Sequence, residues 1–223
     1  MIFPDDFKIV CLHLLHRTDR LPLIKRATEL CGAVEVVEGY TPETAPRKLY
    51  PAMPDKKWAV AVSKLKAFEF AVQSDKEYVL FLEDDCVFEN EENLVGQIQC
   101  ILELAADFDI LYGGCWKYRG NNLIIEKTTP VYRYIGDELI VCNHCLFFRK
   151  SVMKAFIARF FNPDGWENIL DGGNWHSDVM LAHWQKDYNL YICNPFIANQ
   201  RGGASDNYNG HPQAYPKWYY DED

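Results

Sequence analysis

The stretch of residues 77–85, EYVLFLEDD, decides the fold and the place to look for chemistry. Its first six residues form a short apolar run, which is the pattern of a strand buried on both faces of a sheet. The run ends abruptly at three carboxylates, Glu83, Asp84 and Asp85. The sequence therefore predicts a buried strand over 77–82 with an acidic cluster at its carboxyl end.

Short apolar runs and helical patterns alternate on both sides of this stretch. The chain from Asn199 onward is expected to be a polar, mobile tail. Alternation of this kind is typical of an α/β protein with a mixed central sheet flanked by helices, whose ligands bind beyond the carboxyl ends of the strands. Periodicity and turn residues predict helices over 21–30, 58–73, 93–106, 151–160 (with Ser151 as N-cap) and 177–185, and further strands over 7–15, 33–37, 86–88, 109–112, 139–148 and 188–193.

Size and charge narrow the class of protein. A chain of 223 residues with 48% apolar residues suits one domain with a full core. The 32 acidic against 23 basic residues give a net charge of −9, which disfavours nucleic-acid partners. No apolar stretch approaches the roughly 18 to 20 residues of a membrane span, and the acidic start differs from a signal peptide. We expect a soluble, cytoplasmic protein with no nucleic-acid partner and no membrane span.

The eight cysteines lie mostly inside apolar runs, as reduced thiols do in a reducing compartment. Cys142 and Cys145 form a C-x-x-C pair, but no second pair follows at the spacing of a structural zinc site. Their flanks, LIVCNHCLFF, favour a buried strand over a metal site.

Three adjacent carboxylates need a counter-charge. A hard divalent cation such as Mn²⁺ or Mg²⁺ suits their oxygens, and it would in turn bind a diphosphate. A solvated acidic turn is the alternative interpretation. Arg17 and Arg20 follow the first predicted strand at the same sheet edge, and Lys64 and Lys66 lie on the helix before the acidic strand. Taken singly, each of these basic residues is more often a solvated surface charge.

Other catalytic patterns are missing from the sequence. It contains no G-x-S-x-G elbow, no G-x-x-x-x-G-K-[ST] loop and no G-x-G-x-x-G fingerprint, so acyl transfer and the P-loop or Rossmann modes of phosphate binding have no support. His176 and His183 lie two helical turns apart without a further ligand at metal-binding spacing, which favours core or surface roles.

Several blocks, taken in order, resemble the GT-A glycosyltransferases, in particular the lipopolysaccharide and procollagen galactosyltransferase-like family. The resemblance covers nearly the whole chain. It implies a single GT-A, Rossmann-like domain over 1–223, with a nucleotide-binding half of about 1–115 and an acceptor-side half of about 116–223. The blocks are L-x-x-R-x-x-R at 14–20, Ser63-Lys64 in place of the family's Ser-His pair, LFLEDD at 80–85, NHCLFFRKSVMKAF at 143–156, HSDVML at 176–181 and NPFIANQRGGASDN at 194–207.

The resemblance also implies roles on the donor side. Asp85 would hold the metal that bridges the diphosphate, and Glu83 and Asp84 would orient the nucleotide ribose or the waters of the metal. Lys64 departs from the family's usual histidine, which implies a contact of this lysine with the diphosphate or the donor sugar. The nucleotide pocket would be lined by Leu12, His13 and Arg17.

On the acceptor side, Asp178 would be the general base that deprotonates the attacking sugar hydroxyl. The alternative is an acidic residue at a helix start, stabilised by the helix dipole. His211 would supply a further metal ligand from the carboxyl-terminal segment. Aromatic residues in expected loops are candidates for stacking on sugar rings, with core packing as the alternative: Tyr112, Trp116, Tyr118, Trp166 and Trp175.

The leading hypothesis is a Mn²⁺- or Mg²⁺-dependent glycosyltransferase. It would transfer a sugar from a nucleotide-diphosphate donor, a UDP-sugar by the resemblance, to a hydroxyl of a glycan or glycoprotein acceptor. Two alternatives would use the same residues. One is a metal-dependent phosphohydrolase, and the other is a carbohydrate-binding domain without turnover.

Overall fold

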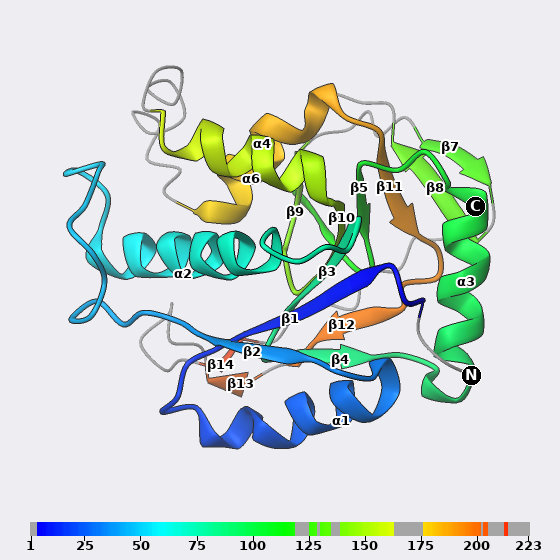
Figure 1. The fold of residues 1–223 in the computed structure, drawn as a ribbon, viewed down its shortest axis with the longest axis horizontal. Coiled ribbons are helices and arrows are strands. Elements are labelled where there is room, and N and C mark those ends of the chain that lie inside the picture. Colours follow the sequence, from blue (N-terminus) through cyan, green and yellow to red (C-terminus); the bar gives the residue numbers. More distant parts are fainter. Residues whose placement is uncertain are drawn as a thin grey trace.

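A mixed eight-stranded sheet runs through the middle of the molecule in the order β2-β1-β3-β10-β5-β11-β8-β7 (Figure 1). The computed structural model describes residues 4–118, 125–128, 130–134, 139–162, 176–201, 203–204 and 212–213. The strands of this sheet are β1 (Phe7–His13), β2 (Glu35–Glu38), β3 (Tyr78–Glu83), β5 (Ile110–Tyr112), β7 (Ile125–Thr128), β8 (Val131–Tyr134), β10 (Cys145–Arg149) and β11 (Leu190–Cys193).

The directions of the strands bring several strand ends together at one edge of the sheet. Strand β1 is parallel to β2 and β3, and β5 is parallel to β11. Strand β10 runs antiparallel between β3 and β5, with Cys145 opposite Leu82 and Leu146 opposite Tyr112. The carboxyl ends of β1, β3, β5 and β11 therefore meet the amino end of β10 at one edge, which we call the site edge. This architecture confirms the mixed α/β sheet that the sequence predicts.

Helices cover both faces of the sheet because successive strand residues are apolar on both sides. Helices α1 (Leu21–Cys31) and α3 (Leu94–Leu104) pack on one face. Helices α2 (Asp55–Ala71), α4 (Lys150–Phe160) and α6 (Ser177–Trp184) pack on the other (Figure 1). The ring of Phe68 in α2 lies 5.0 Å from that of Phe81 and 5.5 Å from that of Phe148. None of the described helices has the length and apolar character needed to cross a membrane.

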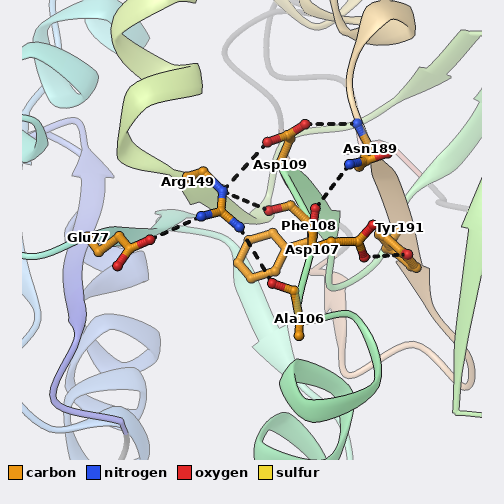
Figure 2. Close-up of polar contacts among 8 residues, drawn as sticks. All are labelled: Glu77, Ala106, Asp107, Phe108, Asp109, Arg149, Asn189 and Tyr191. Atoms are coloured by element: carbon orange, nitrogen blue, oxygen red, sulfur yellow. Dashed lines mark hydrogen bonds and ion pairs between the residues drawn. The ribbon is translucent and has the colours of Figure 1, made fainter.

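A polar network joins the strands at the edge opposite the site edge (Figure 2). Arg149, at the end of β10, donates from Nη1 to Oε1 of Glu77 at 3.0 Å and from Nε to the Phe108 carbonyl at 3.3 Å. Asp109 accepts from the backbone N–H of Asn189 at 3.0 Å, just before β11. Arg149, directly and through Asp109, thereby links the residues that immediately precede β3, β5 and β11.

The strand predicted over 139–148 is divided in two. Strand β9 (Leu139–Val141) pairs with β6 (Trp116–Tyr118), and β10 begins only at Cys145. Between them the backbone of Cys142 has φ = 84°, which breaks the extended conformation. The buried-strand interpretation thus holds for Cys145 and is wrong for Cys142. Helix α4 begins at Lys150 with Arg149 as its N-cap, so the prediction of Ser151 as N-cap is also wrong.

The predicted mobile tail begins with an ordered strand instead. Strand β12 (Ala198–Gln200) pairs antiparallel with β4 (Cys86–Phe88), directly after the acidic cluster. Gly114 makes this approach possible, because a Cβ on it would lie 2.0 Å from the Ala198 carbonyl oxygen. Three short 3₁₀ helices and a third small pair of strands complete the described chain: Thr18–Arg20, Glu91–Asn93 and Gln185–Asp187, with β13 (Gly203–Ala204) and β14 (Pro212–Gln213).

Tyr112 belongs to the core and not to a sugar-binding loop. It lies in β5 and is fully buried, and its hydroxyl lies 2.7 Å from Oε1 of Gln185. The side chains of the other aromatic candidates, Trp116, Tyr118, Trp166 and Trp175, lie outside the described part of the structure.

Candidate functional site

The acidic cluster lies at the site edge, as the sequence predicts for the end of β3. Glu83 is the last residue of β3, and its backbone N–H donates to the carbonyl of His144 at 3.0 Å. The register of β1 and β3 places Leu12 beside Glu83. Leu12 is half-buried and packs against the core on the α2 face.

Asp84 is paired with a residue from the first strand. Its Oδ2 lies 2.8 Å from Nδ1 of His13, whose side chain is buried. Burial raises the pKa of Asp84, and the hydrogen bond with His13 opposes that shift. The structure therefore brings together two residues predicted for the nucleotide site, with His13 in direct contact with the acidic cluster.

Glu83 is paired with Lys64 from helix α2. The Nζ of Lys64 lies 2.8 Å from Oε1 of Glu83, and only 7% of Lys64 is exposed. Burial alone would lower the pKa of this lysine, but the carboxylates of Glu83 and Asp178 outweigh it and hold the pKa above its usual value. Lys64 is therefore a fixed positive charge at the site, and the contact that the structure shows for it is with Glu83.

Asp85 is the least satisfied of the three acids. Its Oδ2 accepts a hydrogen bond from Nε2 of Gln200 at 3.1 Å, whereas its Oδ1 is buried without a hydrogen-bond partner among the described residues. Burial raises the pKa of Asp85 to about 7, with the charges of Glu83 and Asp84 acting in the same direction. A buried carboxylate oxygen of this kind is costly unless a cation or a donor meets it.

These residues suit a divalent cation for which the protein supplies only part of the coordination. The unpartnered Oδ1 of Asp85 is a hard oxygen ligand, and two further carboxylates lie beside it. Over the described ranges, no group of three or more His, Cys, Asp or Glu side chains is arranged to enclose a metal ion. Mg²⁺ sites often use one or two carboxylates and complete their coordination with water and substrate phosphates. The predicted ligand His211 lies outside the described residues.

The two arginines predicted for anion binding occupy different positions. Nε of Arg17 donates to Oδ1 of Asp19 at 2.9 Å, close to the surface. Arg20 is buried, and its positive charge lowers the pKa of both Asp84 and Asp85 against the effect of their burial. Arg20 is thus the arginine that acts on the acidic cluster.

Asp178 lies in the first turn of α6, where its Oδ1 accepts from the Val179 N–H at 3.0 Å. Its charge helps to raise the pKa of Lys64 and opposes the lowering of the pKa of Lys57 by burial; the two lysines lie two helical turns apart on one face of α2. Next to it, Nζ of Lys57 lies 3.1 Å from Nδ1 of His176, and burial lowers the pKa of each of these two groups. The structure therefore connects Asp178 electrostatically to the acidic cluster through Lys64.

A further group of side chains belongs to the site edge and was not predicted from the sequence. Sγ of Cys142 lies 2.9 Å from Nδ1 of His144 and 3.4 Å from Oε1 of Gln200. Nε2 of His144 lies 3.3 Å from the Ala198 carbonyl oxygen. Burial raises the pKa of the Cys142 thiol and lowers that of His144, so both are neutral at pH 7. The C-x-x-C pattern drew attention to Cys142, but no local signal connects it to Gln200.

Comparison with known proteins gives distant likenesses. No protein-family profile and no curated protein matches this chain. Among solved structures, the mannose-1-phosphate geranyltransferase from Thermus thermophilus is 10% identical, with a TM-score of 0.46 over 88% of this chain and 76% of that one. A glycosyltransferase involved in the glycosylation of the major capsid of PBCV-1 is 12% identical, with a TM-score of 0.48 over 85% and 81% of the two chains. The 2-C-methyl-D-erythritol 4-phosphate cytidylyltransferase from Thermus thermophilus is 12% identical, with a TM-score of 0.40 over 84% and 88%.

Because these identities are low, the residues of this chain alone indicate what the site edge can bind. Each of the three acids has a side-chain partner: Lys64 for Glu83, His13 for Asp84, and Gln200 for one oxygen of Asp85. Asp85 alone presents a buried carboxylate oxygen with no described partner. The site edge can therefore accept a cationic or hydrogen-bond-donating ligand at one defined atom.

Proposed function

We propose that this protein is a divalent-metal-dependent glycosyltransferase that uses a UDP-sugar and a hydroxyl of a glycan or glycoprotein acceptor. The observation that carries the proposal is the unpartnered Oδ1 of Asp85 at the carboxyl end of β3. Ligands of open α/β sheets bind beyond this end of the strands. The resemblance of the sequence blocks to GT-A glycosyltransferases supports the same assignment.

The donor side would consist of Asp85, Asp84 and Glu83. Asp85 would hold Mn²⁺ or Mg²⁺, which when bound supplies positive charge for the diphosphate. Glu83 and Asp84, held by Lys64 and His13, would orient the nucleotide ribose or the waters around the cation. Three adjacent carboxylates would repel a diphosphate, and a bound cation would offset that repulsion.

The acceptor side would centre on Asp178. In the transfer, the bond from the anomeric carbon to the diphosphate oxygen breaks, and its electron pair leaves with the diphosphate. The acceptor oxygen forms the new bond to the anomeric carbon and gives its proton to the carboxylate of Asp178. Lys64 interacts electrostatically with both Asp178 and Glu83, so it would connect the acceptor-side base with the donor-side acids.

The test is calorimetric titration of UDP and UDP-glucose, with Mn²⁺ and with EDTA, into wild type and Asp85→Asn. Wild type should bind at least about tenfold more tightly with Mn²⁺, and Asp85→Asn should lose that dependence. The matched control is Asp75→Asn, an exposed acid in the turn before β3, which should bind as wild type does.

Three results would contradict the proposal or change its class. No binding by wild type, or equal Mn²⁺-dependent binding by Asp85→Asn, would rule out the metal-dependent nucleotide site. Rapid phosphate release from UDP without any acceptor would indicate a phosphohydrolase. Sugar binding without donor cleavage at any Mn²⁺ concentration would indicate a carbohydrate-binding domain.

A further inference from the structure

The segment between β9 and β10 contains a backbone conformation that needs a reason. Cys142 has φ = 84°, a value that side-chain-bearing residues rarely adopt. Such a conformation is strained and persists where the surrounding structure imposes it, often at a functional site. The strained residue directly precedes Asn143.

Asn143 lies in the wall of the site edge. On one side of it, the His144 carbonyl accepts from the Glu83 N–H at 3.0 Å. On the other, Sγ of Cys142 lies 3.4 Å from Oε1 of Gln200, the residue that donates to Asp85. The register of β3 and β10 ends with Cys145 opposite Leu82, and the bond from the Glu83 N–H to the His144 carbonyl extends the pairing to the residue next to Asn143.

The side chain of Asn143 is buried but not satisfied. Only 2% of the residue is exposed, and its Oδ1 has no hydrogen-bond partner among the described residues. Whichever way the amide is turned, one of its two polar atoms occupies that buried position. Leaving such an atom unpaired destabilises the folded protein, so a buried polar atom of this kind calls for a partner that the described residues do not supply.

The missing partner has a definite chemistry. The Oδ1 of Asp85 is an acceptor and needs a donor or a cation, whereas the buried atom of the Asn143 amide is an acceptor in one orientation and a donor in the other. A carboxylate attracts a divalent cation more strongly than a neutral amide does. A hydroxyl group both donates and accepts, so it suits the Asn143 amide in either orientation, whereas a phosphate oxygen suits only one of them.

We infer that Asn143 binds a hydroxyl group of the nucleotide-sugar donor. The inference rests on the proposed function and adds a specificity-determining residue to it. The strained backbone at Cys142 positions the amide at the site edge, and the ligand hydroxyl satisfies it. A hydroxyl of the ribose and a hydroxyl of the sugar share this chemistry, and two probes separate them.

The experiment exploits the unusual energetics of an unsatisfied group. Replacing a partnerless buried amide by an apolar side chain removes a cost in the free protein and an interaction in the complex. Asn143→Leu and Asn143→Ala are compared with wild type by urea unfolding without ligand, and by titration of UDP and UDP-glucose in Mn²⁺. Gln73→Leu, an exposed amide at the end of α2 near the opposite edge, is the matched control.

We expect at least one apolar variant of Asn143 to unfold at the urea concentration of wild type or above it. We expect both to bind UDP-glucose about 10- to 100-fold more weakly, while Gln73→Leu is unchanged. An equal loss for UDP and UDP-glucose would place the hydroxyl on the ribose. A loss for UDP-glucose alone would place it on the sugar.

Other outcomes would overturn the inference. Wild-type affinity in both variants would show that the amide does not contact the donor, although the nucleotide site would stand. Lower stability with unchanged affinity would show a purely structural role. Weaker binding of Mn²⁺ alone would make Asn143 a metal ligand. If wild type binds neither probe, the proposed function fails and this inference fails with it.

Discussion

The ammonium nitrogen of Lys64 lies 2.8 Å from Oε1 of Glu83, which places a buried positive charge from α2 against the acidic end of β3. The same lysine acts electrostatically on Asp178 at the start of α6. One side chain therefore connects the two carboxylates predicted for the donor and acceptor sides. A buried charge in this position is stable only as long as its partner is present.

Removing one member of this pair should be strongly destabilising. Lys64→Met leaves the partly buried Glu83 without its partner and should lower the free energy of unfolding by about 2 kcal/mol. The double variant Lys64→Met/Glu83→Gln should recover much of that loss, because no uncompensated charge remains. Urea unfolding measures both.

The control for this cycle is the exposed pair Lys25 and Glu29, whose atoms lie 3.9 Å apart on α1. Lys25→Met should change the free energy of unfolding by less than about 0.5 kcal/mol, because an exposed pair is screened by solvent. Wild-type stability in Lys64→Met would contradict the buried ion pair.

His144 should make stability depend on pH. Burial lowers its pKa below the usual 6.5, while Glu83 and Lys64 act on it with opposite signs. The unfolded chain then binds a proton that the folded protein does not, so stability falls as the pH decreases below about 6.5. This group contributes a slope of at most about 1.4 kcal/mol per pH unit.

His144→Gln should reduce that slope between pH 6.5 and pH 5, measured by urea unfolding at several pH values. His16→Gln, at an exposed residue after β1, should keep the wild-type slope. Identical slopes in all three proteins would mean that His144 does not carry the pH dependence.

The thiols should react at very different rates in the folded protein. All eight cysteines are free, with Cys100 exposed, Cys142 partly buried and the other six buried. Burial raises the pKa of the Cys142 thiol, which makes Cys142 less reactive than the exposed Cys100. A thiol reagent should therefore label Cys100 quickly and Cys142 slowly.

Cys100→Ser should abolish the fast phase, and Mn²⁺ with UDP should slow the labelling of Cys142, since this residue lies at the site edge. Mass spectrometry of the labelled protein assigns each phase. A fast phase that persists in Cys100→Ser would contradict the burial of the other thiols.

Arg149 should contribute to stability without affecting the site. It joins Glu77, Asp109 and the Phe108 carbonyl at the edge opposite the site edge (Figure 2). Arg149→Met should lower the free energy of unfolding by about 1–3 kcal/mol, because partly buried acceptors lose their donor. Nucleotide binding should remain that of wild type.

Lys154→Met is the control for Arg149, because Lys154 is an exposed residue of α4. It should have little effect on stability. A change in nucleotide affinity in Arg149→Met would show that the two edges of the sheet are coupled.

Local pattern was sufficient for the fold class and for the position of the acidic cluster. The apolar run before Glu83 predicts a buried strand because its side chains exclude water on both faces. Strand β3 extends from Tyr78 to Glu83, within one residue of the prediction at each end. The roles predicted for Leu12, His13, Arg17, Lys64 and Asp178 remain predictions, while the structure gives their contacts.

The local sequence pattern could not predict contacts between segments that lie far apart in the chain. The apolar flanks of the C-x-x-C pair predicted one continuous strand, but the turn at Cys142 depends on tertiary neighbours, Gln200 among them. Gln200 itself lies 115 residues from Asp85 along the chain, in a segment whose polar composition suggested a mobile tail. Its strand forms because β4 offers unpaired backbone groups and Gly114 leaves room for it.

The sequence alone was enough to specify a buried strand that ends in EDD within an α/β sheet, because hydrophobic periodicity acts between near neighbours. The state of each carboxylate depended on the packing of distant segments. Lys64 neutralises Glu83, His13 holds Asp84, and Gln200 reaches only one oxygen of Asp85. Burial makes each of these pairings energetically significant, because inside the protein an unpaired polar atom has no water to replace its partner.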